Sequence, residues 1–489
     1  MFSSLFFPLC RRSFLLAVAA TLPAAALAQA PRSTRFLPPD VEQVLQREHI
    51  PLEAVSVVVQ EAGSATPRIN HNARVAVNPA SIDKLLTTFA ALDLLGPAFT
   101  WNTPVWLQGT VRDGVLDGSV FIKGSGDPKL VLERVWLLLR RIQQMGVREI
   151  RGDIVLDRSA FTIPEANPAD FDNEPLRPYN VRPNALLLNL RSVVYIFTPD
   201  AARGVATVSA EPALAGVNVD ATVPLFSGPC EDWRGALKPG IEATRVRFAG
   251  SYSASCGERA WPLAYPDPKS YDQRLIEAAW LELGGKLIGT VRDGPAPVAA
   301  KPSFELVSPQ LAEVVRDINK FSNNVMAQQL FLTLGLQRKG LGTFAASREL
   351  MRDWLAERYG ELASEVVVDN GSGLSRSSRV SAALLARVLQ SAWGSPVMPE
   401  LMASLPVNGL DGTLRRSRAP AGRAHLKTGS LRDVAGVAGY VLAGSGRRYV
   451  LVALINHPNA NAARPALDAL VQWTLDDARF DKLNPKSTE

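Results

Sequence analysis

The sequence has few cysteine and histidine residues, and this scarcity excludes several classes of protein. It contains three cysteines and four histidines among 489 residues, without a CxxC pair. The histidines show no ligand spacing, so we expect no metal site and no cofactor (His49, His71, His425 and His457). It also lacks a Lys/Arg-rich block and its formal net charge is only +6, which gives nucleic acid little support as a partner.

The remaining composition is that of a globular protein. Hydrophobic residues make up 47% and charged residues 20% of the chain, which is enough for a sizeable core. The length predicts two or three domains. Internal repeats are not evident, and after the first thirty residues no apolar stretch is long enough to cross a membrane.

The N-terminal segment has the pattern of an export signal. Paired arginines precede an apolar run that ends in small residues, RRSFLLAVAATLPAAALA (residues 11–28). This pattern predicts a signal peptide over residues 1–28, cleaved after Ala28, and the paired arginines resemble a twin-arginine signal. An uncleaved N-terminal anchor is the alternative. Both interpretations place the folded part outside the cytoplasm, in the periplasm, where the mild positive charge favours weak association with an anionic wall or membrane surface.

Cysteine usage agrees with export. Cys10 lies within the predicted signal, so the mature chain keeps Cys230 and Cys256. Two cysteines close in sequence in an exported protein predict a disulfide, which would contribute up to about 3 kcal/mol in the chain-entropy model.

Hydrophobic periodicity divides the chain into three parts. Helix and buried-strand patterns occupy residues 29–100, with a buried helix expected from Leu85 to Leu95. Short strands joined by Asp-Gly turns dominate residues 101–302. Strong helix patterns return over residues 303–489, which close with two apolar strands and a helix. We therefore expect an α/β (α+β) domain split in sequence by a β-rich insertion.

Three short motifs occur in this order: SIDK (81–84), SNN (322–324) and KTGS (427–430). Each is a weak signal alone, because a Ser-x-x-Lys pair on a helix is usually solvated and Lys-Thr-Gly usually forms a turn. Their joint occurrence, each in a suitable structural setting, predicts a single site.

The residue types explain why these motifs would belong together. Residues i and i+3 share a helix face, so Lys84 can reach the hydroxyl of Ser81. An unprotonated lysine can remove the proton of that hydroxyl, and burial beside a second cation such as Lys427 would lower its pKa. Free backbone N–H groups in the first turn of a helix suit an oxyanion forming at Ser81.

The other two motifs offer groups that such a reaction needs. Ser322 supplies a second hydroxyl that can pass a proton to the leaving amine, and the Asn324 amide can fix the lysine and the substrate backbone. Lys427 and Thr428 could hold a substrate carboxylate. Gly429 leaves room for the substrate backbone to pair along a strand.

The combination SxxK, SxN and KTG resembles the penicillin-recognising serine acyl-transferases. Within that group the chain resembles the D-alanyl-D-alanine carboxypeptidase/endopeptidase family, the low-molecular-mass class C penicillin-binding proteins. Four further stretches carry the closer match: IKGSGDPKL (122–130), PYNVRPNALLLN (178–189), DNGSGLSRSSRVS (369–381) and SLPVNGLDGTLRRS (404–417). A long insertion between the first two motifs is also a feature of the family.

This resemblance implies a fold like that of the serine β-lactamases and DD-peptidases. Its core would be an antiparallel sheet flanked by helices, with β-rich inserted domains. The substrates would be peptidoglycan stem peptides, and β-lactam antibiotics would be inhibitors. The implied catalytic residues are Ser81 as nucleophile, Lys84 as base, Ser322, Asn324 and Lys427. The implied substrate-binding residues are Thr428, Gly429, Ser430 and, in the insertion, Asp157.

The resemblance gives finer expectations as well. The oxyanion would rest on the backbone N–H groups of Ser81 and Ser430, and Asp157 resembles in context the aspartate that meets the amine of the peptidoglycan side chain. Three positions depart from the family pattern: Asn323 and Gln328 replace acidic residues, and Asn370 stands as an extra residue in the DNGSGLSR loop.

Two other functions share the same motifs. A β-lactamase on this scaffold would need fast deacylation, but no E-x-x-L-N stretch of the class A type is present. A catalytically inactive wall-binding protein would not need the motif residues, which are all intact. The sequence leaves open the balance between carboxypeptidase and endopeptidase activity, the stem-peptide preference and the oligomeric state.

Overall fold

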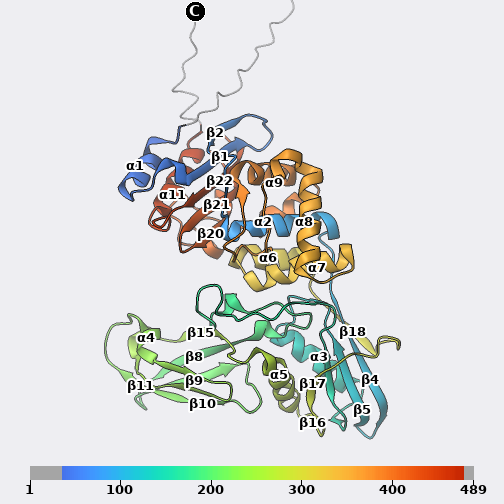
Figure 1. The fold of residues 1–489 in the computed structure, drawn as a ribbon. Coiled ribbons are helices and arrows are strands. Elements are labelled where there is room, and N and C mark those ends of the chain that lie inside the picture. Colours follow the sequence, from blue (N-terminus) through green and yellow to red (C-terminus); the bar gives the residue numbers. More distant parts are fainter. Residues whose placement is uncertain (1–35, 478–489) are drawn as a thin grey trace, which may run out of the picture.

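The computed structural model describes residues 36–477. The predicted signal peptide lies outside this range. The described chain forms two parts, a sheet-and-helix domain that contains all three motifs and an insertion that emerges from it after α2 (Figure 1). None of the helices in this range is long and apolar enough to cross a membrane.

The motif-containing domain is built on an antiparallel sheet of five strands in the order β2-β1-β22-β21-β20. Its strands, with the short pair β3 and β19, are β1 (Val55–Glu61), β2 (Pro67–His71), β3 (Ala76–Val77), β19 (Val380–Ser381), β20 (Ala424–Leu431), β21 (Val434–Leu442) and β22 (Arg448–Asn456). Its helices are α1 (Pro39–Arg47), α2 (Lys84–Leu95), α6 (Leu311–Phe321), α7 (Asn324–Lys339), α8 (Phe344–Tyr359), α9 (Ala382–Trp393), α10 (Met398–Ser404) and α11 (Arg464–Leu475).

Alternation along the strands divides the core between the two faces of this sheet. On β22, Val450, Val452 and Leu454 pack with the helices that surround α2. Their neighbours Leu451 and Ala453 point the other way and pack with α1 and α11. An antiparallel sheet covered by helices on both faces confirms the expected fold.

Helix α2 is central in this domain. Every residue from Lys84 to Leu92 is buried, and α2 contacts α6, α7, α8, α9 and α10. A helix that is apolar on all sides is stable only inside a core, which explains the continuous apolar run in the sequence. Ser81 and Lys84, at the N-terminal end of α2, are therefore held by a helix that is packed on all sides.

The insertion contains three sheets. One has seven strands and includes β4, β5, β7 and β18; another has the order β14-β11-β9-β8-β15; and a small one has the order β10-β13-β12. The strands are β4 (Asn102–Arg112), β5 (Val115–Lys123), β6 (Glu149–Ile150), β7 (Ile154–Asp157), β8 (Ser192–Asp200), β9 (Val205–Glu211), β10 (Asn218–Val219), β11 (Thr222–Phe226), β12 (Pro239–Ile241), β13 (Arg245–Phe248), β14 (Tyr252–Ser253), β15 (Arg259–Ala264), β16 (Lys286–Leu287), β17 (Val291–Asp293) and β18 (Phe304–Val307).

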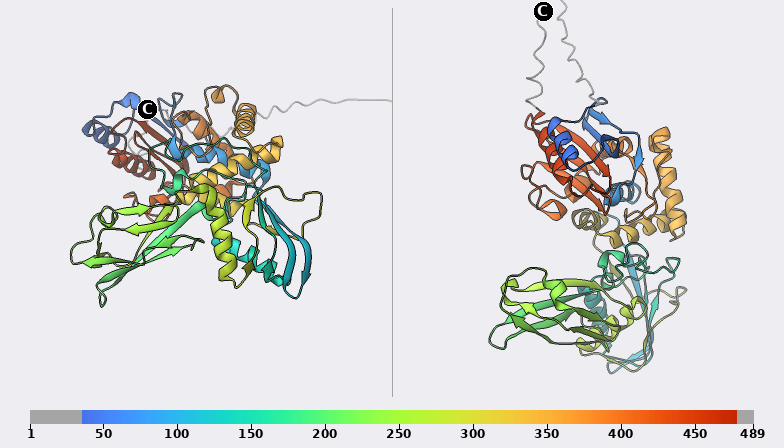
Figure 2. Two further views of the ribbon diagram at one scale, coloured as in Figure 1. Left: turned by 60° about the horizontal axis from the view of Figure 1, so that its bottom comes forward. Right: turned by 60° about the vertical axis from the view of Figure 1, so that its left-hand side comes forward.

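Three helices accompany these strands: α3 (Leu132–Gln144), α4 (Trp233–Leu237) and α5 (Pro268–Glu282). Helix α5 lies between the two larger sheets, as the views in Figures 1 and 2 show, and its apolar residues join the hydrophobic cluster of both. A disulfide links Cys230 to Cys256 within the insertion.

The insertion extends slightly beyond its predicted end. Strand β18 (Phe304–Val307) pairs antiparallel with β4, the first strand of the insertion. The predicted boundary at residue 303 therefore falls before the last inserted strand. Lys301-Pro302-Ser303 has the composition of a linker. The chain after it first forms the last strand of the inserted sheet and only then returns to the motif-containing domain.

Candidate active site

The Ser81 hydroxyl and the Lys84 amine are in direct contact. Ser81 lies in a 3-10 turn, Ala80–Asp83, that leads into α2. The sequence pattern placed it in the first turn of the helix itself. Lys84 Nζ donates a hydrogen bond to Ser81 Oγ at 2.9 Å, and the Lys84 side chain is completely buried. The turn is held in an unusual conformation, because Ala80 has φ of +48°, a region that costs energy for a residue with a Cβ.

Two further acceptors surround the Lys84 amine. Its Nζ lies 2.6 Å from Asn324 Oδ1 and 2.5 Å from the carbonyl oxygen of Ser372. Both oxygens can only accept hydrogen bonds. A neutral amine has two N–H groups and one lone pair, so these acceptors use both N–H groups and leave the lone pair facing the Ser81 hydroxyl. In the neutral form of Lys84, the contact with Ser81 is therefore one in which the serine donates.

Burial favours that neutral form. Loss of hydration, followed by the charge of nearby Lys427, lowers the pKa of Lys84 well below its usual value, and Asp83 opposes this in part. Burial likewise lowers the pKa of Lys427 to about 7. Because the positive charge of each lysine disfavours protonation of the other, the two amines lose their protons in a coupled way.

Lys427 joins the third motif to the second. It lies on β20 with its side chain completely buried, and its Nζ donates to Ser322 Oγ at 2.8 Å and to the Thr428 carbonyl at 2.9 Å. Together with the contact between Lys84 and Asn324, this bond brings all three sequence motifs into one site.

Local structure explains the form of the second motif. Ser322 ends α6 in the left-handed region, with φ of +56°, and turns the chain sharply toward α7. Asn323 is the N-cap of α7, where its side chain accepts the Met326 N–H at 3.0 Å. Asparagine and aspartate cap helices about equally well, so the departure at residue 323 preserves this function. Asn324 then begins α7 and points to Lys84.

A cavity of about 1060 Å³ opens at this site. One wall carries Ser81, Ser322 and Asn324 from the motif-containing domain. The insertion contributes further lining residues, which include Asp172 and Tyr179. Further lining residues include Phe171, Asn189, Ser192, Arg376, Ser430 and Arg432. The reacting groups therefore face a cleft that both parts of the chain build.

Comparison with known proteins identifies the family. The model of the D-Ala-D-Ala carboxypeptidase 3 (S13) family matches residues 37–476, nearly the whole described chain. The chain belongs to the S13 family. It is a serine-type D-alanyl-D-alanine carboxypeptidase and penicillin-binding protein, as the resemblance of its motifs predicted.

Two relatives show how far the similarity extends. The chain is 27% identical over 444 residues to a D-alanyl-D-alanine carboxypeptidase of Actinomadura sp. (strain R39), covering 86% of this chain and 80% of that protein. It is 24% identical over 412 residues to the carboxypeptidase DacB of Haemophilus influenzae, covering 79% of this chain and 82% of that protein.

A solved structure supports the S13 fold. Penicillin binding protein 4 (dacB) from Haemophilus influenzae superposes with a TM-score of 0.71 at 21% identity, over 91% of this chain and 99% of that one. Its structure in complex with a novel β-lactam gives a TM-score of 0.67 at the same identity. At this identity the match establishes the arrangement of sheet, helices and inserted domains.

One residue expected to bind substrate in this S13 protein does not reach the cleft. Asp157 ends β7 inside the insertion and is only 3% exposed. One of its oxygens accepts the Ser159 N–H at 2.8 Å and the other accepts the Ala296 N–H at 2.8 Å. It is absent from the lining of the Ser81 cavity. The structure therefore does not place Asp157 with the other predicted site residues, because its carboxylate joins two backbone segments of the insertion.

Asp172 is the carboxylate that the sequence reasoning missed. It is the acidic residue among those that line the Ser81 cavity. Its oxygens accept hydrogen bonds from the Tyr179 hydroxyl at 2.9 Å, from the Asn180 amide at 2.8 Å and from the Glu174 backbone N–H at 3.1 Å. It lies in a Pro-rich passage without periodicity, where a single aspartate gives no signal in the sequence.

The structure gives an additional reason for the glycine of the third motif. A Cβ on Gly429 would lie 2.6 Å from the Pro79 carbonyl oxygen and 3.1 Å from the Ile82 side chain. The residue is small so that β20 can pack against the turn that carries Ser81. Thr428 bonds Thr413 on the exposed side, and the exposed Ser430 lines the cavity.

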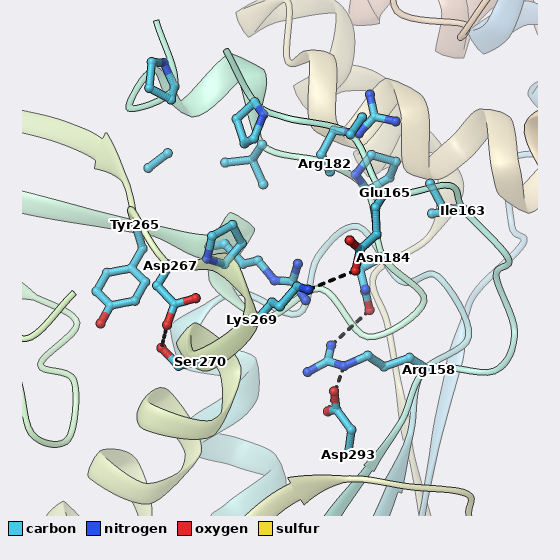
Figure 3. Close-up of a pocket in the computed structure, with 18 of the residues that line it drawn as sticks. Arg158, Ile163, Glu165, Arg182, Asn184, Tyr265, Asp267, Lys269, Ser270 and Asp293 are labelled. Atoms are coloured by element: carbon cyan, nitrogen blue, oxygen red, sulfur yellow. Dashed lines mark hydrogen bonds and ion pairs between the residues drawn. The ribbon is translucent and has the colours of Figure 1, made fainter. Parts of the chain in front are cut away.

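A second cavity of about 690 Å³ lies in the insertion (Figure 3). Arg158 binds Asp293 at its floor, and an exposed ion pair between Lys269 and Glu165 spans it. It contains none of the motif residues. Within residues 36–477 we find no group of three or more potential metal ligands.

Proposed function

We propose that this protein is an exported periplasmic DD-peptidase that cleaves peptidoglycan stem peptides through an acyl-enzyme on Ser81. The observation that supports this most is the buried Lys84 amine, which lies 2.9 Å from the Ser81 hydroxyl while the Asn324 amide oxygen and the Ser372 carbonyl accept its other hydrogen bonds. The RR-containing apolar segment before residue 29 supports export.

In the proposed acylation, Lys84 takes the Ser81 proton as Oγ attacks the carbonyl between two D-alanines. The new Oγ–C bond forms and the carbonyl oxygen becomes an oxyanion, held by the backbone N–H groups of Ser81 and Ser430. The C–N bond then breaks, and the proton passes from Lys84 to the leaving amine through the Ser322 hydroxyl. Water later hydrolyses the ester and restores Ser81.

The substrate carboxylate would bind near the third motif. Lys427 and Thr428 lie on the edge strand β20, which also carries Ser430 in the lining of the cavity. A carboxylate there would stabilise the protonated form of Lys427, whose pKa is about 7 in the free enzyme. Beyond Leu426, whose N–H donates to the Pro406 carbonyl, the outer edge of β20 would pair with the extended substrate backbone.

Asp172 would recognise the amine on the side chain of the stem peptide. The Tyr179 hydroxyl, the Asn180 amide and the Glu174 backbone N–H use three of the roughly four lone-pair sites of the carboxylate, which leaves capacity for one more donor. Burial and the bond to Asp172 raise the pKa of Tyr179 to about 12, so the phenol remains a donor to this carboxylate.

We also propose that β-lactams acylate Ser81 and that cross-linked peptides are substrates, which would add DD-endopeptidase activity. The solved relative in complex with a β-lactam supports the first point. A predatory peptidoglycan endopeptidase from Bdellovibrio bacteriovorus shares the fold, with a TM-score of 0.50 at 17% identity.

Mass spectrometry of the intact protein after benzylpenicillin treatment tests this proposal. We expect a persistent adduct of one penicillin per chain, mapped to the peptide that contains Ser81, and no adduct in Ser81→Ala. A rapidly hydrolysed adduct with penicillin turnover would instead indicate a β-lactamase. An unlabelled wild-type protein that still binds peptidoglycan would indicate the inactive wall-binding alternative.

A further inference from the structure

The loop from Asp369 to Ser375 supplies one of the two acceptors that fix the Lys84 amine. That acceptor is the carbonyl oxygen of Ser372, which is completely buried and lies 2.5 Å from Lys84 Nζ. If this carbonyl turned away, a Lys84 N–H would be free to point at Ser81. The serine would then accept the hydrogen bond instead of donating it, and its proton would lack a base.

The Asn370 side chain holds that carbonyl in place. Asn370 Oδ1 accepts the backbone N–H of Ser372 at 3.0 Å and the Ser372 hydroxyl at 2.8 Å. Its Nδ2 donates to the Leu374 carbonyl at 2.9 Å. One amide therefore bonds to the peptide groups on both sides of the Ser372 carbonyl, and it needs both its oxygen and its nitrogen to do so.

The Ser372 hydroxyl closes the same network. It donates to Asn370 and accepts from the Leu374 N–H at 3.2 Å and from Gln328 Nε2 at 3.4 Å. Gln328 lies on α7, one turn after Asn324, the other acceptor of the Lys84 amine. An uncharged amide at residue 328 can donate to this hydroxyl, which a glutamate could not do when ionised.

The loop is packed too tightly to compensate by moving. A Cβ on Gly373 would lie 1.8 Å from the Ala80 carbonyl, next to the nucleophile, and a Cβ on Gly371 would lie 2.5 Å from Phe331. Both glycines have φ of +71°. The backbone around Ser372 therefore lies directly against the turn that carries Ser81, so the loop as a whole cannot shift to restore the Ser372 carbonyl if its side-chain bonds are lost.

We infer that Asn370 is a positioning residue for acyl transfer, which orients the Ser372 carbonyl so that the lone pair of Lys84 faces Ser81. Asn370 does not itself contact the reacting atoms. This inference rests on the proposed role of Ser81 and Lys84. It assigns a function to Asn370, the residue that departs from the family pattern in the DNGSGLSR loop.

The test measures the rate of acylation by a fluorescent penicillin as a function of pH in three variants. Asn370→Ala removes the bonds to the loop without adding a charge. Asn370→Asp keeps the acceptor for Ser372, loses the donor to Leu374 and adds a negative charge near Lys84. Thr87→Val is the matched control, because Thr87 Oγ1 binds the Gly371 carbonyl at 2.7 Å and supports the same loop away from Ser372.

We expect Asn370→Ala to acylate about 10-fold more slowly on the pH plateau, a part of the ~10²–10⁴-fold that a positioned base provides. Asn370→Asp should move the acid limb of the profile to higher pH, because an added negative charge stabilises protonated Lys84. Its effect on the pKa of Lys84 has the same sign as that of Asp83 and the opposite sign to that of Lys427. Thr87→Val should lower the melting temperature comparably but keep its acylation rate within about twofold of wild type.

Equal rate losses in Asn370→Ala and Thr87→Val would overturn the inference, since both would then reflect a loosened loop. A wild-type rate in Asn370→Ala would also overturn it. Absence of acylation in the wild-type protein would instead contradict the proposed function, so the two failures are distinguishable.

Discussion

Replacing Asp172 by asparagine should reduce activity only on peptides that carry a free side-chain amine. The exchange keeps the shape of the side chain and an acceptor for Tyr179 or Asn180, but removes the charge. Two unit charges about 4 Å apart interact by about 1 kcal/mol in water and about 4 kcal/mol at a protein surface of effective dielectric constant 20. Because Asp172 is half-buried at the cavity wall, we expect about 1 to 2 kcal/mol. That corresponds to about 5- to 30-fold in kcat/KM.

The assay is D-alanine release from two stem peptides, one with the side-chain amine free and one with it acetylated. Wild type and Asp172→Asn on both peptides form a double-mutant cycle that isolates the interaction between the carboxylate and the amine. Glu174→Gln is the matched control, since Glu174 is a neighbouring exposed carboxylate outside the cavity lining. Equal losses on both peptides, or a similar loss in Glu174→Gln, would refute this role of Asp172.

Three further changes have defined outcomes. Lys427→Met removes a charge that lowers the pKa of Lys84, so the acid limb of the pH–acylation profile should move to higher pH. Burial raises the pKa of Asp83 from 3.8 to about 7, so ionisation of Asp83 destabilises the folded protein as the pH rises through this interval. The melting temperature of Asp83→Asn, relative to wild type, should therefore increase from about pH 4 to about pH 8. Replacing Cys230 and Cys256 by serine should remove about 3 kcal/mol from the insertion, measured by calorimetry, with acylation unchanged.

The sequence predicts the chemistry of this site well because the informative residues are local. Ser81 and Lys84 are three positions apart, and the apolar pattern that follows them shows that a buried helix begins there. The meeting of Lys84 with Asn324 joins residues separated by 240 positions. Periodicity cannot predict such a contact, and the resemblance to a known family supplied it.

What the sequence could not provide depends mainly on backbone groups and irregular segments. The Ser372 carbonyl is an acceptor that every residue type possesses, so nothing in the sequence marks it. Asp157 and Asp172 differ in the structure by which backbone or side-chain donors surround them, whereas both appear in the sequence as isolated aspartates. The size of Gly429 is explained by the Pro79 carbonyl, which only the packed structure brings near.

The secondary structure of the insertion shows a further limit. Strands β4 and β5 follow from their Asp-Gly turn, but the short strands that complete the sheets contain only two to four residues. The β-rich pattern of residues 101–302 does not predict helix α5, although Pro268 at its start is a standard signal for the beginning of a helix. The strand β18 is defined by its pairing with β4, and pairing between distant segments has no signature in a four-residue strand.

The most direct measurement of the central claim compares the acylation rate of wild type with that of Lys84→Met, using the same β-lactam and intact-mass detection. Methionine retains the buried volume but has no basic nitrogen. We expect stoichiometric labelling of Ser81 in the wild-type protein and a rate about 10²–10⁴-fold lower in Lys84→Met. Labelling of Lys84→Met at the wild-type rate would contradict proton transfer from Ser81 to Lys84.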